Sequence, residues 1–404
     1  MQTQMYNLIK ILHAAFFDDA PALEAPDWEA LYQLAEEQSI VPLFNEGAGK
    51  YEEYESMPEK HRLDISVRSV VLISMQAQKT SGFLAAYDAL LGAGLRPLLI
   101  KGLICRSAYG ELADHRISGD EDIYIPKQDF VKCRDILLQL GYTMKGPELS
   151  EEMLGSVQAV SFCSQSLTIE VHINLFGTDS WLGRRCNSFF TNAFDKAVSL
   201  NIDGSEGPRT VYTMEPTQNY LFLFLHFYKH FLSIGVGLRQ IIDITLFYDM
   251  LRNKIELSEV EGILCELRAD RLYADALAIG EMLGFSVPTS LSGLDTDVLI
   301  DEMTDSGIYG NMDRMNSHYV INAVLNGGSP SKGILQRILP PLSSMQKNFP
   351  VLRDYPILYP IAWVRRCLSF INRGDIVLRG KNLPHTLETA NKRLELMKKY
   401  GIVD

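Results

Sequence analysis

The sequence lacks features that would place the protein in a membrane or outside the cell. Its 404 residues include no uncharged apolar run of about 18 residues, the length that a membrane-spanning helix needs. The N-terminal residues, MQTQMYNLIKILHAAFF, lack the basic segment and the small-residue cleavage site of a secretory signal, and their apolar residues recur at helical spacing. We therefore expect a cytoplasmic protein without a membrane span.

Cysteine and positive charge are also scarce. The six cysteines are scattered and form no C-x-x-C pair, which argues against a disulfide framework and a cysteine zinc site and favours a reducing compartment. Lys and Arg total 38 against 50 Asp and Glu, a net charge of −12. Nucleic-acid affinity comes mostly from neutralising phosphates, so this net charge disfavours a nucleic-acid partner. A local basic patch is the alternative that the net charge does not exclude. Cys105 and Cys133 fall on apolar helix faces and are expected to be core thiols.

The chain contains enough apolar residues, 47% of the total, to bury a large core over two or three domains. Residues 1–85 are helical in pattern. Residues 86–205 alternate strand and helix patterns, and residues 206–404 are again mostly helical. We predict an α+β fold: a small mixed β-sheet core with helices packed on it, flanked by N- and C-terminal helical sections.

The central section carries the most informative pattern. RPLLIK (96–101) and DEDIYIP (120–126) are short apolar strands, and VQAVSFCS with LTIEVHINL (157–164 and 167–175) predicts a hairpin. Gly102 begins a helix after the first strand, and residues 127–142 have the apolar periodicity of another helix.

Three carboxylates of this section can converge. Side chains alternate faces along a strand, so Asp120 and Asp122 share one face while Glu121 points to the other. Glu170 lies with His172 on the polar face of the later strand, and it joins the aspartates if the two strands are neighbours. Carboxylate oxygens are the ligands that Mg²⁺ prefers, and three of them suit a two-metal site for phosphoryl-type displacement. The alternative is a solvated acidic turn.

Backbone amides and cationic side chains near the carboxylates could bind phosphate. Gly102 stands at a strand-to-helix junction, where free amides and the helix dipole favour an anion. Lys101 and Arg116 add positive charge, and Ser118 adds a hydroxyl in the segment before the aspartates. These groups are the candidates for binding nucleotide phosphates, with ordinary surface cations as the alternative for the two charged residues.

The segment HFYKHF places His226 and His230 one helical turn apart, which could hold zinc, but no Glu follows the first His as in a metalloprotease and no Cys lies nearby. The alternative is an aromatic core helix with one polar edge. We favour the core helix. Lys229 and His230, with Arg239 and Asp243 further on, are candidates for lining a cleft that faces the sheet. Arg239 and Asp243 are four residues apart and can pair on one helix face.

Together, LIKG, HRISGDEDIYI, IEVHINL, HFYKHF and GVGLRQIIDI resemble the polymerase-β-like nucleotidyltransferase superfamily, and within it the uncharacterised bacterial nucleotidyltransferase-family proteins. The resemblance implies an enzyme that uses Mg²⁺, with two ions and with Mn²⁺ as an alternative. It implies a nucleoside triphosphate such as ATP as donor, a hydroxyl acceptor and released pyrophosphate. The residues that it assigns to metal binding and catalysis are Asp120, Asp122 and Glu170. The residues that it assigns to nucleotide or substrate binding are Gly102, Lys229, His230, Arg239 and Asp243.

Two positions depart from the superfamily pattern. Leu103 stands where serine or glycine is usual, and Glu121 stands where an apolar residue is usual. They favour an alternative in which the fold is catalytically inactive and binds a nucleotide or a protein partner. The sequence identifies neither the acceptor nor the oligomeric state.

Overall fold

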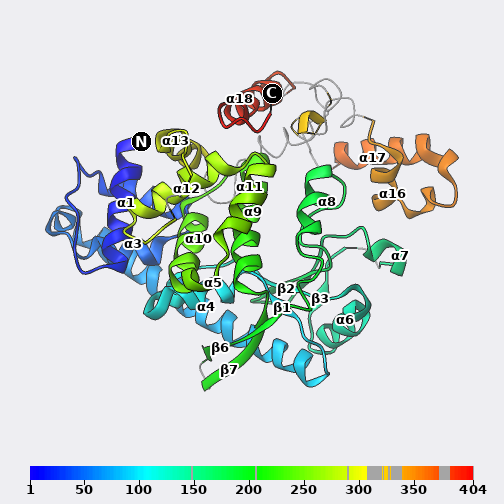
Figure 1. The fold of residues 1–404 in the computed structure, drawn as a ribbon, viewed down its shortest axis with the longest axis horizontal. Coiled ribbons are helices and arrows are strands. Elements are labelled where there is room, and N and C mark those ends of the chain that lie inside the picture. Colours follow the sequence, from blue (N-terminus) through cyan, green and yellow to red (C-terminus); the bar gives the residue numbers. More distant parts are fainter. Residues whose placement is uncertain are drawn as a thin grey trace. The chain divides into compact units, whose positions relative to one another are not determined.

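The computed structural model describes residues 1–146, 149–204, 207–288, 291–306, 321, 323–325, 328, 339–372 and 383–403. They form two compact units. The larger unit takes in residues 1–229 and the described residues of 236–306, and the smaller takes in 230–235 and the described residues beyond 310. Figure 1 shows the elements of both units as ribbons.

The N-terminal section is helical, as the sequence predicts. Its helices are α1 (Gln2–Phe16), α2 (Trp28–Glu37), α3 (Val41–Ala48) and α4 (Glu59–Gly92). The Asp27 side chain accepts a hydrogen bond of 3.1 Å from the Ala30 amide and so caps the start of α2. Close packing of α1 on α3 depends on Gly47, where a Cβ would lie 1.9 Å from the Ile11 carbonyl oxygen.

The sheet has seven strands in the order β3-β4-β5-β2-β1-β7-β6. The strands are β1 (Leu98–Leu99), β2 (Glu121–Tyr124), β3 (Thr143–Met144), β4 (Ala159–Cys163), β5 (Thr168–His172), β6 (Val198–Gly204) and β7 (Gly207–Thr213). The β2–β5 and β1–β7 pairs are parallel and the other neighbours are antiparallel. The sheet is therefore mixed, which confirms the predicted α+β class and the β4–β5 hairpin.

Three strands are missing from the sequence-based prediction. They are β3, which pairs with β4, and the hairpin of β6 and β7, which pairs with β1. The helices between the strands are α5 (Leu103–Arg106), α6 (Phe130–Gln139), α7 (Glu151–Leu154) and α8 (Trp181–Ser188). The predicted helix after Gly102 is thus a single α-helical turn, continued by a 3₁₀ segment at Ser107–His115.

Helices from both helical sections contact the sheet. From α4, the Tyr87 hydroxyl accepts a hydrogen bond of 3.0 Å from the Tyr212 amide on β7. From α9 (Pro216–Ser233), the Asn219 side-chain amide donates to the Thr213 hydroxyl at 2.6 Å. The remaining helices of the larger unit are α10 (Leu238–Leu251), α11 (Leu257–Glu266), α12 (Asp270–Met282) and α13 (Thr296–Ser306). Gly235, with φ of 110°, lies between α9 and α10.

In the smaller unit, the structure describes α16 (Leu342–Asn348), α17 (Tyr359–Asn372) and α18 (Leu383–Lys399). Met345, Leu352 and Ala362 form a small buried cluster there. The predicted C-terminal helical section, 206–404, is described only in part, because many residues after 306 lie outside the described residues. Among the described helices, none is long and apolar enough to cross a membrane.

Candidate metal and nucleotide site

The site is built on the two parallel strands at the middle of the sheet. In the β2–β5 register, Asp122 stands opposite Glu170 and Tyr124 stands opposite His172. Side chains that face each other across neighbouring strands lie on the same face of the sheet. The strand adjacency that the parity argument required is therefore present, and it joins two segments that are fifty residues apart in the chain.

Asp122 is the centre of this arrangement. Its Oδ1 lies 2.9 Å from the Lys101 ammonium and 2.9 Å from His172 Nε2, and the residue is only 3% exposed. Burial opposes ionisation, but the charge of Lys101 and the hydrogen bond with His172 outweigh it, so the pKa of Asp122 lies below its usual range. Asp122 is a buried carboxylate held in its charged form.

His172 links the two carboxylates. Its Nε2 lies 3.6 Å from Glu170 Oε2 as well as 2.9 Å from Asp122. Burial lowers the basicity of the imidazole, but the hydrogen bonds to both carboxylates dominate and raise its pKa. The ligand atoms of Asp122, Glu170 and His172 all lie within 4.8 Å of one another, which is compact enough to surround one metal ion. Glu170 is the most accessible of the three, with a side chain 32% exposed.

Asp120 lies beside this group rather than inside it. It precedes β2, is half-buried, and is not one of the three residues whose ligand atoms cluster. Burial, followed by repulsion from Asp122, raises the pKa of Asp120 to about 6. Its carboxyl therefore takes up a proton as the pH falls through about 6, and a divalent cation at the site would favour its ionised form.

A second lysine reaches the same region from α9. The Lys229 ammonium donates to Gln158 Oε1 at 3.3 Å, from a helix that follows the sheet. Burial lowers the pKa of Lys229 to about 8, and repulsion from Lys101 adds to the effect while Glu170 and Asp122 oppose it. Lys229 and Lys101 thus place two positive groups around the carboxylates. His230, the next residue of α9, belongs to the smaller unit, so its position relative to the site stays a prediction.

The turn at Gly102 holds an internal anion. Glu121 Oε2 accepts a hydrogen bond of 3.0 Å from the Leu103 amide at the start of α5, and Glu121 Oε1 lies 2.6 Å from the Arg106 guanidinium. Gly102 has φ of 48°, and a Cβ there would lie 2.1 Å from Glu121 Oε2. The two departures from the superfamily pattern therefore belong together, because the Glu121 carboxylate takes the position at the helix start that was predicted for phosphate.

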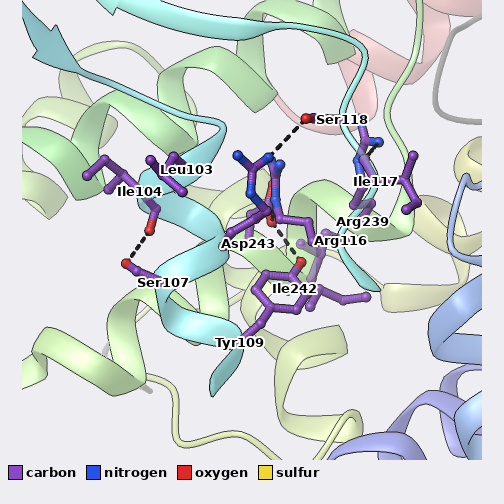
Figure 2. Close-up of polar contacts among 12 residues, drawn as sticks. Leu103, Ile104, Ser107, Tyr109, Arg116, Ile117, Ser118, Arg239, Ile242 and Asp243 are labelled. Atoms are coloured by element: carbon purple, nitrogen blue, oxygen red, sulfur yellow. Dashed lines mark hydrogen bonds and ion pairs between the residues drawn. The ribbon is translucent and has the colours of Figure 1, made fainter. Parts of the chain in front are cut away.

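Arg116 is also occupied within the protein. Its Nε and Nη2 each lie 2.6 Å from a different carboxylate oxygen of Asp243, and Tyr109 donates to Asp243 Oδ1 at 2.7 Å (Figure 2). The expected pairing of Arg239 with Asp243 on one face of α10 is wrong. Arg239 instead donates to the Ile117 carbonyl, while Asp243 receives Arg116 from a segment 127 residues earlier.

Ser118 is buried in a polar network. Its amide donates to Gln76 Oε1 at 2.8 Å, and its hydroxyl accepts from Arg106 at 3.0 Å and contacts Glu121 at 3.2 Å. Lys79 donates to the Ser118 carbonyl at 2.8 Å. The structure shows these groups as structural contacts of the segment before β2. Gln76, Lys79, Arg106 and Tyr109 had no recognisable signal in the sequence, because each looks like an ordinary residue of a helix.

The remaining predictions concern metal binding elsewhere and the cysteines. The aromatic residues Phe222, Phe224 and Phe227 of α9 are fully buried, as expected for an aromatic core helix, and His226 and His230 are half-buried. Cys105 and Cys133 are fully buried, as expected for core thiols.

Comparison with known protein families assigns the chain to a family. The profile of the uncharacterised nucleotidyltransferase family matches residues 24–284, which include the sheet, α4, α9 and α10. The chain belongs to this family and is therefore a nucleotidyltransferase-class enzyme. No curated protein and no solved structure matches the chain.

Proposed function

We propose that the protein transfers a nucleoside monophosphate from a nucleoside triphosphate to a hydroxyl acceptor and releases pyrophosphate, with Mg²⁺ or Mn²⁺ as the required cation. The observation that carries the proposal is the convergence of Asp122, Glu170 and His172 within 4.8 Å on two neighbouring strands. The alternative of a solvated acidic turn fits poorly, because Asp122 is buried and both of its close partners are cationic or polar.

The donor set fits a divalent cation. Two carboxylates supply hard oxygen ligands, and one imidazole nitrogen is a ligand that Mn²⁺ accepts more readily than Mg²⁺. Asp120 stands close enough to Asp122 for their charges to repel, so it is available to complete the ligand set with a second cation. When bound, such cations neutralise the phosphate charge and orient the two reacting oxygens.

The residues of the chain have separate roles in this reaction. Lys101 and Lys229 supply positive charge for the triphosphate, in place of the amides at Gly102, whose position the Glu121 carboxylate takes. Glu170, the most exposed carboxylate, accepts the proton of the acceptor hydroxyl. The acceptor oxygen then bonds to the α-phosphorus while the bond from that phosphorus to the pyrophosphate oxygen breaks. In the absence of a metal, His172 holds Asp122 and Glu170 in their relative positions, and as a metal ligand its imidazole would be neutral.

The test is transfer from α-labelled triphosphates by Asp122→Asn, with a panel of sugars, small hydroxyl compounds and proteins as acceptors. We expect the variant to lose activity by several orders of magnitude while keeping its circular dichroism spectrum. Asp135→Asn, an exposed aspartate of α6, is the matched control and should keep full activity. Equal rates for the wild type and Asp122→Asn would refute the proposal.

The internal anion at α5 favours one alternative, a non-catalytic protein that binds a nucleotide or a protein partner. Glu121 fills the position where members of the superfamily hold phosphate, so a triphosphate has fewer backbone donors here. A thermal-shift screen of nucleotides with and without Mg²⁺ separates the two. Stabilisation by a triphosphate only when Mg²⁺ is present supports the enzyme, whereas no response to any nucleotide supports the alternative.

A further inference from the structure

The segment that leads into β2 is anchored to helices on several sides. Arg116 binds Asp243 on α10 through two hydrogen bonds of 2.6 Å, and the next residue, Ile117, receives a hydrogen bond at its carbonyl from Arg239 of the same helix (Figure 2). Ser118 is bonded at its amide by Gln76 of α4. Three consecutive residues, 116–118, are thus fixed one residue before Asp120.

The contacts from α10 are poor candidates for substrate contacts. Both oxygens of Asp243 are engaged by Arg116, and Tyr109 adds a third hydrogen bond to the same carboxylate. Arg116 is 6% exposed and Asp243 is 7% exposed, so the pair is enclosed by protein. A nucleotide would have to break a bidentate ion pair inside the protein to reach either group, and breaking such a pair carries a large penalty.

Position matters here because ligands two residues apart must point at one small region. Gly119 alone separates the anchored segment from Asp120, and of the two aspartates only Asp122 is held further by β2 pairing and by Lys101. A shift of residues 116–118 would therefore move Asp120 first and tilt the start of β2. Groups that hold the ligands of a metal are known to change its affinity by about 10- to 100-fold when they are replaced.

We propose that α10 positions the metal-binding strand: Asp243, through Arg116, and Arg239, through the Ile117 carbonyl, hold the segment before β2 so that Asp120 and Asp122 face Glu170. This inference rests on the proposed metal site and assigns Arg239 and Asp243 as positioning residues. It predicts that changes on α10 alter metal affinity although neither residue contacts the metal ligands.

The test is Mn²⁺ binding to the full chain, measured as free Mn²⁺ by electron paramagnetic resonance, for Asp243→Asn and Arg239→Met. Asn keeps the shape of Asp and removes its charge, and Met keeps the length of Arg and removes its hydrogen bond. Measurements are made at a temperature where near-ultraviolet circular dichroism shows each variant folded. We expect Mn²⁺ affinity to fall by about tenfold or more in both variants. In the absence of metal, hydrogen exchange of the Ser118 amide should be faster in both variants than in the wild type.

A matched control separates positioning from a general loss of stability. Tyr273→Phe removes a buried hydrogen bond of 2.9 Å between Tyr220 and Tyr273, on helices α9 and α12, and should leave Mn²⁺ affinity unchanged. The inference is overturned if either α10 variant binds Mn²⁺ like the wild type, or if the Tyr273→Phe protein weakens binding equally. Asp122→Asn decides the underlying site separately: if it binds Mn²⁺ normally, the proposed function fails, whereas its loss of binding beside normal α10 variants refutes the positioning role alone.

Discussion

The Lys101 ammonium lies 2.9 Å from Asp122 Oδ1; the lysine stands two residues after β1 and the aspartate lies on the adjacent β2. The pair gives the site a resident positive charge before any substrate arrives. Burial opposes the charge of Lys101, but Asp122 and Asp120 outweigh that effect and raise the lysine pKa. The ammonium therefore stays protonated through the neutral range. Its charge repels a metal ion and attracts a phosphate group.

Lys101→Met separates these two effects. Removing a cation beside Asp122 should strengthen divalent-metal binding, because metal and ammonium repel each other at short range. The same change should raise the KM for the triphosphate by about tenfold, equivalent to ~1.4 kcal/mol, because a charged phosphate contact is lost. Metal titration and steady-state kinetics of one variant test both signs. Weaker metal binding would show that Lys101 supports the ligand set instead of competing with the cation.

Gly102→Ala should destabilise the protein by about 2–4 kcal/mol. The added Cβ would lie 2.1 Å from Glu121 Oε2, and the positive φ of this residue favours glycine. Urea denaturation measures the free energy of unfolding. Gly119→Ala is the matched control in the same region, because a Cβ there meets nothing within 4 Å. Equal stability of the two variants would mean that the Glu121–Leu103 contact is not rigid.

The buried Arg106–Glu121 pair offers a double-mutant cycle. Arg106→Met or Glu121→Leu alone leaves one buried charge without its partner and should cost about 3–5 kcal/mol of the free energy of unfolding. The double variant removes both charges and should be less destabilised than the sum of the two single changes. Additive losses would indicate that the two side chains do not interact. The double variant also returns an apolar residue to the position between the two aspartates.

Metal binding should weaken as the pH falls through about 6, where Asp120 takes up a proton. Because the folded pKa of Asp120 is raised, the metal-free protein holds this proton below pH 6 and binding must displace it. Calorimetry in buffers of different ionisation enthalpy should detect proton release near pH 6. Asp120→Asn should reduce that release. In the metal-free protein, the same group contributes stability that is present at acidic pH and is lost as the pH rises from 3.8 through about 6.

The sequence predicts the strands that carry the carboxylates, because each strand is marked by a pattern of neighbouring residues. Alternation along 167–175 places Glu170 on the polar face, and the aspartates mark the start of β2, so a single assumption of adjacency brings them together. The same alternation, Val198, Leu200 and Ile202, was a usable signal for β6 that our prediction did not include.

Other parts of the site depend on distant partners. The Arg116–Asp243 pair joins positions 127 residues apart, and nothing near either residue marks the other as its partner. The local rule that charges four residues apart pair on a helix predicted Arg239 for Asp243, and tertiary packing overrode it. His172 is a similar case, because only the strand register reveals that its imidazole lies between two carboxylates.

Strand β1, which has only two residues, connects the two halves of the sheet. Only Leu98 and Leu99 join the half that contains β5 and β2 to the half that contains β7 and β6. Within the sheet, a pull on the β6–β7 hairpin is therefore transmitted through these two residues, while Tyr87 of α4 holds β7 from outside the sheet. Lys101 follows two residues after this short strand, so β1 connects the outer hairpin with the ion pair of Lys101 and Asp122.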